Sequence, residues 1–142
     1  MAKNTVLVVD DEEYMVSLLR RALTDESTEV IGACNGLEAL DLVVNRHVDL
    51  VIADNNMPKL LGEKLLGEVR KLDPFIQLIM ITGYPSMDVI NKMLEIGISD
   101  FVIKPFNLQE LQDMVRETLR RVERWRKLRK DWSSNQKPTG PA

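Results

Sequence analysis

Five short apolar runs recur along the chain, separated by longer segments with helical periodicity. The runs are rich in Val, Ile and Leu, and several are apolar nearly throughout, which is typical of strands covered on both faces of a parallel sheet. They occupy residues 5–9, 28–33, 48–53, 76–81 and 100–103. This alternation predicts βαβ units with right-handed crossovers. We therefore expect an α/β fold, a doubly wound five-stranded parallel sheet flanked by five helices.

The last helical segment is the longest. It opens at Asn107, a good N-cap, with Glu110 in the capping-box position three residues later. Its apolar stripe continues beyond what a sheet of this size can cover; its members are Leu108, Leu111, Val115, Leu119, Val122, Trp125, Leu128 and Trp132. We therefore expect one domain over residues 1–122, a helical extension of the fifth helix over 123–132, and a disordered tail with linker composition over 133–142.

Composition and charge narrow the class of protein. The 142 residues suffice for one domain, and 44% apolar with 29% charged residues is typical of a globular protein. A net charge of −3 gives no reason to expect direct nucleic-acid binding, and the single cysteine, Cys34, excludes an internal disulfide. We find no signal peptide and no apolar stretch near the ~20 residues that a membrane-spanning helix needs. The sequence thus predicts a cytoplasmic protein without membrane contact.

Acidic residues follow two of the apolar runs, and a lysine follows another. Asp10 and Asp11 follow the first run, Asp54 the third and Lys104 the fifth. The carboxyl ends of parallel strands meet at one edge of a sheet, where ligands bind. Three carboxylates there repel one another unless a cation joins them, and Mg²⁺ prefers such hard oxygen ligands. One aspartate can then act as a nucleophile towards a phosphoryl group, with Lys104 and the hydroxyl of Thr82 binding its oxygens.

Five stretches together resemble the receiver domain of bacterial two-component response regulators, over about residues 4–122. They are Val-Leu-Val-Val-Asp-Asp-Glu (6–12), Asn-Gly-Leu-Glu-Ala-Leu (35–40), Asp-Leu-Val-Ile-Ala-Asp-Asn-Asn-Met-Pro (49–58), Met-Ile-Thr-Gly-Tyr (80–84) and Asp-Phe-Val-Ile-Lys-Pro-Phe (100–106). In this order and spacing they are highly specific. The resemblance implies the flavodoxin-like topology of CheY-like domains and a role in phosphorylation-controlled signalling.

The resemblance assigns the chemical roles position by position. Asp54 matches the phosphoacceptor and Lys104 the phosphate-binding lysine. Asp11 matches the direct ligand of Mg²⁺ and Asp10 its water-mediated neighbour. Asn56, two residues past the acceptor, would contribute its backbone carbonyl to the metal.

The resemblance also implies a switch. Thr82 matches the switch hydroxyl and Phe101 the switch aromatic, a position where the family often has tyrosine. Phenylalanine cannot hydrogen-bond outward, so only packing can distinguish its two rotamers, and its swing would reshape the surface of the fourth helix, fifth strand and fifth helix. Asn56 and Tyr84 occupy the positions that tune the lifetime of the phosphoryl group, and we expect Tyr84 to slow hydrolysis by partly shielding it.

The implied partners are a sensor histidine kinase or a histidine phosphotransferase as the donor, and an output domain or effector protein as the target. The apolar stripe, with Trp125 and Trp132, predicts a homodimer through the face of the fourth and fifth helices. The densely mixed charges that flank this stripe are typical of a solvated coiled coil and not of a nucleic-acid-binding surface.

Two other interpretations stay open. The first is a degenerate, receiver-like dimerisation or scaffold module that does not use phosphorylation, although the full set of acids, Thr82 and Lys104 is present. The second is a hydrolase that transfers phosphoryl groups from a small substrate, although Asn56 stands where a second catalytic acid would be expected. We expect a signalling domain that catalyses only its own phosphorylation and dephosphorylation, and no other enzymatic reaction.

Overall fold

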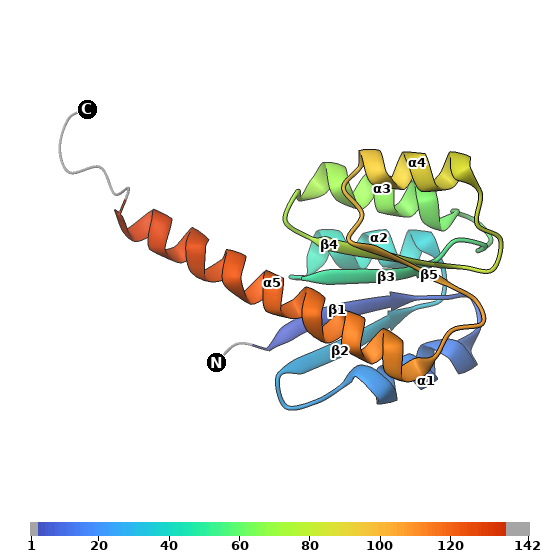
Figure 1. The fold of residues 1–142 in the computed structure, drawn as a ribbon, viewed down its shortest axis with the longest axis horizontal. Helices are drawn as coiled ribbons and strands as arrows, with labels where there is room; N and C mark the ends of the chain where they lie inside the picture. Colours follow the sequence, from blue (N-terminus) through green and yellow to red (C-terminus); the bar gives the residue numbers. More distant parts are fainter. Residues whose placement is uncertain (1–2, 136–142) are drawn as a thin grey trace.

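The structure, a computed structural model, describes residues 3–135, with side chains described through residue 131. Within it, five strands alternate with five helices. The strands are β1 (Asn4–Val9), β2 (Thr28–Ala33), β3 (Leu50–Asp54), β4 (Gln77–Thr82) and β5 (Asp100–Ile103). The helices are α1 (Glu13–Leu23), α2 (Gly36–Asn45), α3 (Gly62–Leu72), α4 (Met87–Glu95) and α5 (Leu108–Asn135). The predicted doubly wound parallel sheet flanked by five helices is confirmed (Figure 1).

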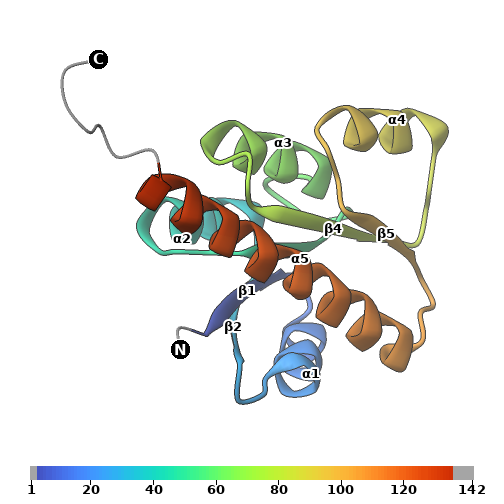
Figure 2. The same ribbon diagram turned by 60° about the vertical axis from the view of Figure 1, so that its left-hand side comes forward.

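The sheet has the strand order β2-β1-β3-β4-β5, and all its strands are parallel. Helices α1 and α5 cover one face, and α2, α3 and α4 cover the other (Figures 1 and 2). Alternate residues of β1 enter opposite cores: Val6 and Val8 pack on the α1 and α5 side, whereas Leu7 and Val9 pack on the other side. This double burial explains why the strands are apolar nearly throughout.

The strand boundaries agree closely with the sequence pattern, since the second and fifth runs match β2 and β5 and the others differ by one or two residues. The largest difference is at the start of β3, which begins at Leu50 and not at residue 48. Asp49, just before it, turns its carboxylate towards β1, where Oδ2 accepts a hydrogen bond from the backbone N–H of Thr5 at 2.8 Å. The acidic residue Asp54 is the last residue of β3.

The long helix α5 begins as the sequence predicts, with Oδ1 of Asn107 accepting the backbone N–H of Glu110 at 3.1 Å. It continues to Asn135, three residues beyond the expected end of the helical extension. Ser and Asn lower helix propensity only by up to about 0.7 kcal/mol each, and the first proline after the helix is Pro138, so residues 133–135 can stay helical. Residues 136–142 of the predicted tail lie outside the described residues. No helix within 3–135 is both long enough and apolar enough to span a membrane.

The extension of α5 is fastened to the domain at the amino ends of the strands. Arg126 Nη2 donates to Oδ1 of Asp49 and to Oδ1 of Asn4, both at 3.0 Å. Asn4 Nδ2 donates in turn to Oε1 of Glu123 at 3.0 Å, and His47 Nε2 lies 2.7 Å from Asp49 Oδ1. We call these five residues the amino-edge network. It shows that contacts with the domain continue beyond residue 122, where the sequence pattern placed the domain boundary.

Candidate functional site

Strand register brings the predicted acids together at the carboxyl edge of the sheet. Val9 pairs with Ala53 in adjacent parallel strands, so the residues that follow them, Asp10 and Asp54, are neighbours at this edge. Carboxylate oxygens of Asp10, Asp11 and Asp54 lie within 4.8 Å of one another. Asp10 and Asp54 are buried and Asp11 is exposed, so the cluster opens to solvent on one side.

Lys104 faces the same cluster from the end of β5. Its Nζ forms an ion pair with Oδ1 of Asp54 at 2.8 Å, and its backbone N–H donates to the carbonyl oxygen of Thr82 at 2.9 Å. Partial burial acts to lower the pKa of Lys104, but the carboxylates of Asp54 and Asp10 outweigh burial and hold that pKa above its usual range. Lys104 is therefore a fixed positive charge at neutral pH.

Asp10 is held in an environment that resists its ionisation. Burial raises the pKa of Asp10 from 3.8 to about 6. The backbone N–H of Glu12, which donates to Asp10 Oδ1 at 2.9 Å, offsets part of this rise, and the neighbouring charge of Asp54 adds to it. A cation bound between the carboxylates would remove this cost.

The residues present fit a Mg²⁺ ion. Oδ1 of Asp54 is buried, and apart from the ion pair with Lys104 it has no hydrogen-bond donor among the described residues. Three carboxylates within 4.8 Å supply the hard oxygen ligands that Mg²⁺ prefers. Asn56 is exposed two residues after Asp54, the last residue of β3, so its backbone lies at the same edge of the sheet.

The loop after β3 contains a residue that the sequence interpretation missed. Asn55 is buried: its backbone N–H donates to Ile81, and its side-chain Oδ1 accepts the N–H of Glu63 at 3.0 Å in the first turn of α3. Gly62 lets α3 start against this loop, because a Cβ there would overlap the backbone of Asp54 and Asn55. A polar residue between a strand and a helix start is the signal that could have identified Asn55 as a capping residue.

The predicted switch residues occupy different places. Thr82 is buried at the end of β4, and its Oγ1 accepts the backbone N–H of Tyr84 at 3.1 Å. Tyr84 is 80% exposed and lines a surface cavity of about 600 Å³ together with Lys104. Phe101 is partly buried, packs against the core between the sheet and α2, α3 and α4, and pairs with Met80, two residues before Thr82 along β4. Thr82, Lys104 and the acids therefore converge, whereas Phe101 stands behind them on β5.

The fold and the site define a class of protein: doubly wound α/β domains whose carboxyl edge holds an acidic cluster beside a fixed lysine. The chain belongs to the response regulator receiver domain family, whose family model matches residues 6–116. The resemblance found in the sequence is thereby confirmed. It makes this chain a receiver domain of two-component regulatory systems, while the roles of individual site residues remain predictions.

Relatives of known sequence or structure agree with this assignment. The chain is 41% identical over 120 residues to the "Probable transcriptional regulator ycf27" of Cyanidium caldarium, covering 83% of this chain and 47% of that protein. It is 33% identical to "Sporulation initiation phosphotransferase F" of Bacillus subtilis, covering 84% and 96%. A CheY-like response regulator receiver domain protein from Methanospirillum hungatei superposes with a TM-score of 0.82 at 29% identity, covering 87% and 98%. The chain thus spans about half the length of the ycf27 relatives.

Proposed function

We propose that Asp54 accepts a phosphoryl group from a sensor histidine kinase or a histidine phosphotransferase. The observation that carries the proposal is the state of the Asp54 carboxylate: it is buried, paired with Lys104 at 2.8 Å and grouped with two further acids. Burying this carboxylate lowers the stability of the fold, since like charges repel and Oδ1 has no hydrogen-bond donor other than Lys104 among the described residues.

Asp10, Asp11, Asp54 and the backbone carbonyl of Asn56 would hold Mg²⁺. When bound, the ion would supply positive charge to the carboxylates and to the oxygens of the incoming phosphoryl group. Its neutralising effect would let Asp10 ionise in a place where burial otherwise opposes its charge.

The transfer exchanges one bond for another. A carboxylate oxygen of Asp54 forms the new O–P bond, while the N–P bond of the donor's phosphohistidine breaks and its electron pair returns to the imidazole nitrogen. Lys104 then leaves Asp54 and contacts a phosphoryl oxygen, and it stabilises the negative charge of that oxygen. The reaction needs no further substrate, so the domain acts as a phosphoacceptor and not as an enzyme that turns over free phosphoesters.

The switch is a population shift between two packings of the α4, β5 and α5 surface. The Thr82 hydroxyl, which accepts the Tyr84 N–H in this structure, has its hydrogen free to donate to a phosphoryl oxygen. Movement of Thr82 would change the space behind it and favour a different rotamer of Phe101 on β5. Asn56 and Tyr84, both exposed next to the site, would set how quickly water reaches the phosphoryl group.

The output would depend on this surface and on the extension of α5. Large apolar side chains are exposed along α4, β5 and α5; they are Met87, Leu94, Ile103 and Leu128. Apolar residues in such positions support a homodimer through the face of α4 and α5. Because several relatives are longer regulators, this domain would control an attached output domain or a separate effector protein. We expect it to act in the cytoplasm.

The decisive experiment measures intact mass after incubation with acetyl phosphate and Mg²⁺. We expect one phosphoryl adduct on the wild type, none on Asp54→Ala, and none on the wild type after addition of EDTA. Asp88→Ala, which removes an exposed carboxylate on α4, is the matched control and should keep the adduct. A wild type without any adduct would contradict the proposal and favour a scaffold module that does not use phosphorylation.

Small-angle scattering tests the dimer separately. We expect a dimer, strengthened by a phosphoryl mimic such as beryllofluoride, and Leu128→Glu should weaken it because that substitution places charge on the exposed stripe of α5. Scattering from a monomer both with and without the mimic would reject this part of the proposal while leaving phosphorylation of Asp54 intact.

A further inference from the structure

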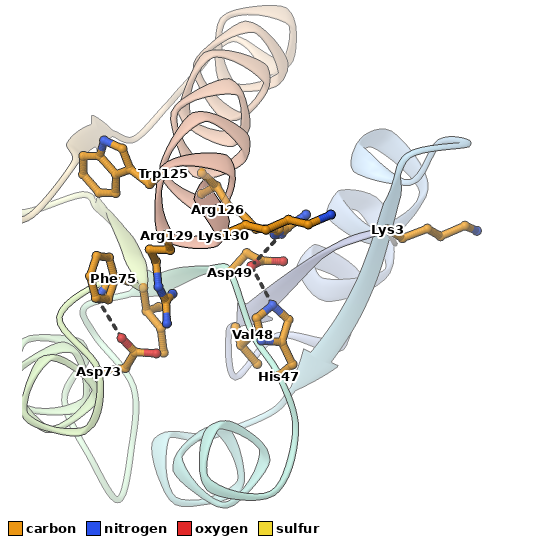
Figure 3. Close-up of a pocket in the computed structure, with 12 residues that line it drawn as sticks. Lys3, His47, Val48, Asp49, Asp73, Phe75, Trp125, Arg126, Arg129 and Lys130 are labelled. Carbon is orange, nitrogen blue, oxygen red and sulfur yellow. Dashed lines mark hydrogen bonds and ion pairs between the residues drawn. The ribbon is translucent and has the colours of Figure 1, made fainter. Parts of the chain in front are cut away.

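A second cavity lies at the opposite edge of the sheet from Asp54. It has a volume of about 510 Å³ and opens between the extension of α5, the loop before β3 (47–49) and the loop before β4 (73–76) (Figure 3). We call it the amino-edge cleft. Its size falls within the range of about 300–1,000 Å³ that is typical of small-molecule sites. None of the residues assigned to phosphoryl transfer lines it.

The walls of the cleft are fixed by hydrogen bonds. On one side, the buried carboxylate of Asp49 holds Arg126 of α5 and His47 of the preceding loop. On the other side, Arg70 of α3 donates from Nη1 to the backbone carbonyls of Asp73 and Ile76, at 3.2 and 2.8 Å, and so ties down the loop before β4. A ligand would therefore find the cleft largely formed, at a small cost in conformational entropy.

The lining combines an apolar floor with aromatic walls. Val48, Ile76 and Val122 lie in the floor. Phe75 and Trp125 stand at the same end of the cleft, and they are 43% and 37% exposed. Large aromatic side chains left partly open beside a cavity give flat apolar surfaces on which a planar molecule can lie.

The rim is positively charged. Lys3, Arg129 and Lys130 line the cleft, and none of them forms an ion pair with a carboxylate within the described part of the chain. The acids of the cleft are already engaged, since Asp49 binds Arg126 and Asp73 accepts the backbone N–H of Phe75 at 2.8 Å. Asp73 keeps its negative charge, but four cationic side chains line the cleft against two carboxylates, so the balance of charge that a ligand meets is positive.

Arg129 joins the charged rim to the aromatic wall. Its guanidinium carbon lies 4.2 Å from the centroid of the Phe75 ring, the distance of a cation–π contact. This contact restrains the guanidinium group, and none of its N–H groups forms an ion pair within the described part of the chain, so they can bind a carboxylate or phosphate in a bidentate manner. Figure 3 shows Lys3 at the far end of the cleft from Phe75 and Trp125, with Lys130 pointing towards Lys3, so Arg129 is the cation beside the aromatic wall.

We propose that the amino-edge cleft is a binding site for a small organic anion with a planar apolar body, whose carboxylate or phosphate contacts Arg129, while Lys130 adds positive charge at the rim. The ring lies against Trp125 and the part of Phe75 that Arg129 leaves exposed, and the anionic group lies at the rim. Such a ligand contacts both the extension of α5 and the loop before β4, so its binding strengthens the attachment of that helix to the domain.

The experiment uses the indole N–H signal of Trp125 in a ¹H–¹⁵N correlation spectrum. The chain has two tryptophans, so Trp132→Phe leaves Trp125 as the only reporter. Three probes with one ring system are titrated into this protein: 1-naphthoate, 1-naphthyl phosphate and the neutral 1-naphthalenemethanol. We expect a saturable shift with at least one anion, and binding of the alcohol about tenfold weaker or more, as expected for loss of a charged hydrogen bond. The two anions distinguish carboxylate from phosphate.

Arg129→Gln should weaken binding of the preferred anion to the level of the alcohol, and Lys130→Gln should weaken it less. Arg124→Gln is the matched control, because it removes the same charge from the same helix but at an exposed position outside the cleft. Three results would each overturn the proposal: no saturable shift with either anion, equal binding of anion and alcohol, or equal loss in Arg129→Gln and Arg124→Gln. The titration uses neither Mg²⁺ nor a phosphoryl donor, so its failure would not affect the assignment of Asp54.

Discussion

Strand β3 is flanked by two buried carboxylates that have opposite surroundings. At its amino end, Asp49 is satisfied on both oxygens: Oδ2 accepts the N–H of Thr5, and Oδ1 contacts Arg126 and His47. At its carboxyl end, Asp54 has one cationic neighbour, Lys104, two acidic neighbours, and an Oδ1 without a hydrogen-bond donor other than that lysine among the described residues.

The difference indicates a structural role for Asp49 and supports the reactive role that we propose for Asp54. A buried charge whose hydrogen bonds are complete leaves no partner unpaired and has little left to offer a ligand. A buried charge beside other acids costs stability unless something positive binds there. The same residue type at the two ends of one strand therefore serves opposite purposes, and the difference can be tested by making the same substitution at each end.

The largest expected effect comes from comparing Asp49→Ala with Asp54→Ala. Asp54→Ala should abolish the phosphoryl adduct and change the free energy of unfolding little, because it removes a repelled charge as well as an ion pair. Asp49→Ala should keep the adduct but lower the free energy of unfolding by about 2–3 kcal/mol, since it leaves the Thr5 N–H and the partly exposed Arg126 without their acceptor. Urea unfolding followed by circular dichroism, together with intact mass, measures both.

An exposed ion pair provides the control for this comparison. Asp113→Ala removes the partner of Arg116 on the surface of α5 and should cost less than about 0.5 kcal/mol. If Asp49→Ala were no more destabilising than Asp113→Ala, the amino-edge network would not contribute measurably to the free energy of unfolding. The proposed difference between Asp49 and Asp54 would then be wrong.

Two glycines in α3 test how closely that helix must approach Asp54. Gly62→Ala places a methyl group against the backbone of Asp54 and Asn55, and should destabilise by about 2 kcal/mol and slow phosphorylation by displacing the acceptor strand. Gly67→Ala meets no atom within 4 Å and should stabilise the same helix by up to about 1 kcal/mol. Similar unfolding midpoints and phosphorylation rates for the two variants would contradict this interpretation of the packing.

The raised pKa of Asp10 predicts that, without Mg²⁺, the free energy of unfolding decreases as the pH rises. The pKa rises from its ordinary value of 3.8 to about 6 in the folded domain, so the folded state holds the extra proton between these values and stability falls as the pH rises through that window. In EDTA at about pH 7.5, Asp10→Asn should therefore be more stable than the wild type by about 1–2 kcal/mol, and the difference should vanish near pH 4.

Addition of Mg²⁺ provides the second half of that test. The ion should stabilise the wild type in urea unfolding, because it favours the ionised form of Asp10, and it should stabilise Asp10→Asn less. If Asp10→Asn were less stable than the wild type in EDTA at neutral pH, the ionised Asp10 carboxylate would not destabilise the folded domain as its burial implies.

The smallest effect is expected at Tyr84. Its side chain is mostly exposed and shares a cavity with Lys104, so it can hinder the approach of water only in part. Tyr84→Ala should speed loss of the phosphoryl group severalfold, as followed by intact mass after the donor is removed. Tyr84→Phe should behave like the wild type, since it keeps the bulk of the ring. An unchanged rate in Tyr84→Ala would end the shielding hypothesis.

The carboxyl-edge site could be predicted from the sequence because each of its residues is identified by its immediate neighbours in the chain. Asp10, Asp54 and Lys104 each directly follow an apolar run, and parallel strands bring such positions to one edge. Burial on both faces of β1 and β3 leaves few alternatives for their register, so the acids had to meet.

The amino-edge network could not be predicted in the same way. It joins Asn4 to Glu123 and Asp49 to Arg126, pairs that are distant along the chain and that no short motif connects. Asp49 lies inside an apolar run whose pattern predicts a strand, and Arg126 is one of many arginines on a helix expected to be solvated. Only the packing of α5 across the sheet determines which arginine reaches the carboxylate.

The length of α5 beyond the domain makes it a mechanical lever. From Arg126, which is still bonded to the domain, to Asn135 the helix rises about 14 Å, so a tilt of about 10° at Arg126 would displace the far end by about 2 Å. A small repacking beneath α5 would thus be magnified where the helix ends. Arg126 holds the lever near its pivot, so the bonds to Asp49 and Asn4 set the force that such a repacking must exceed before the far end moves.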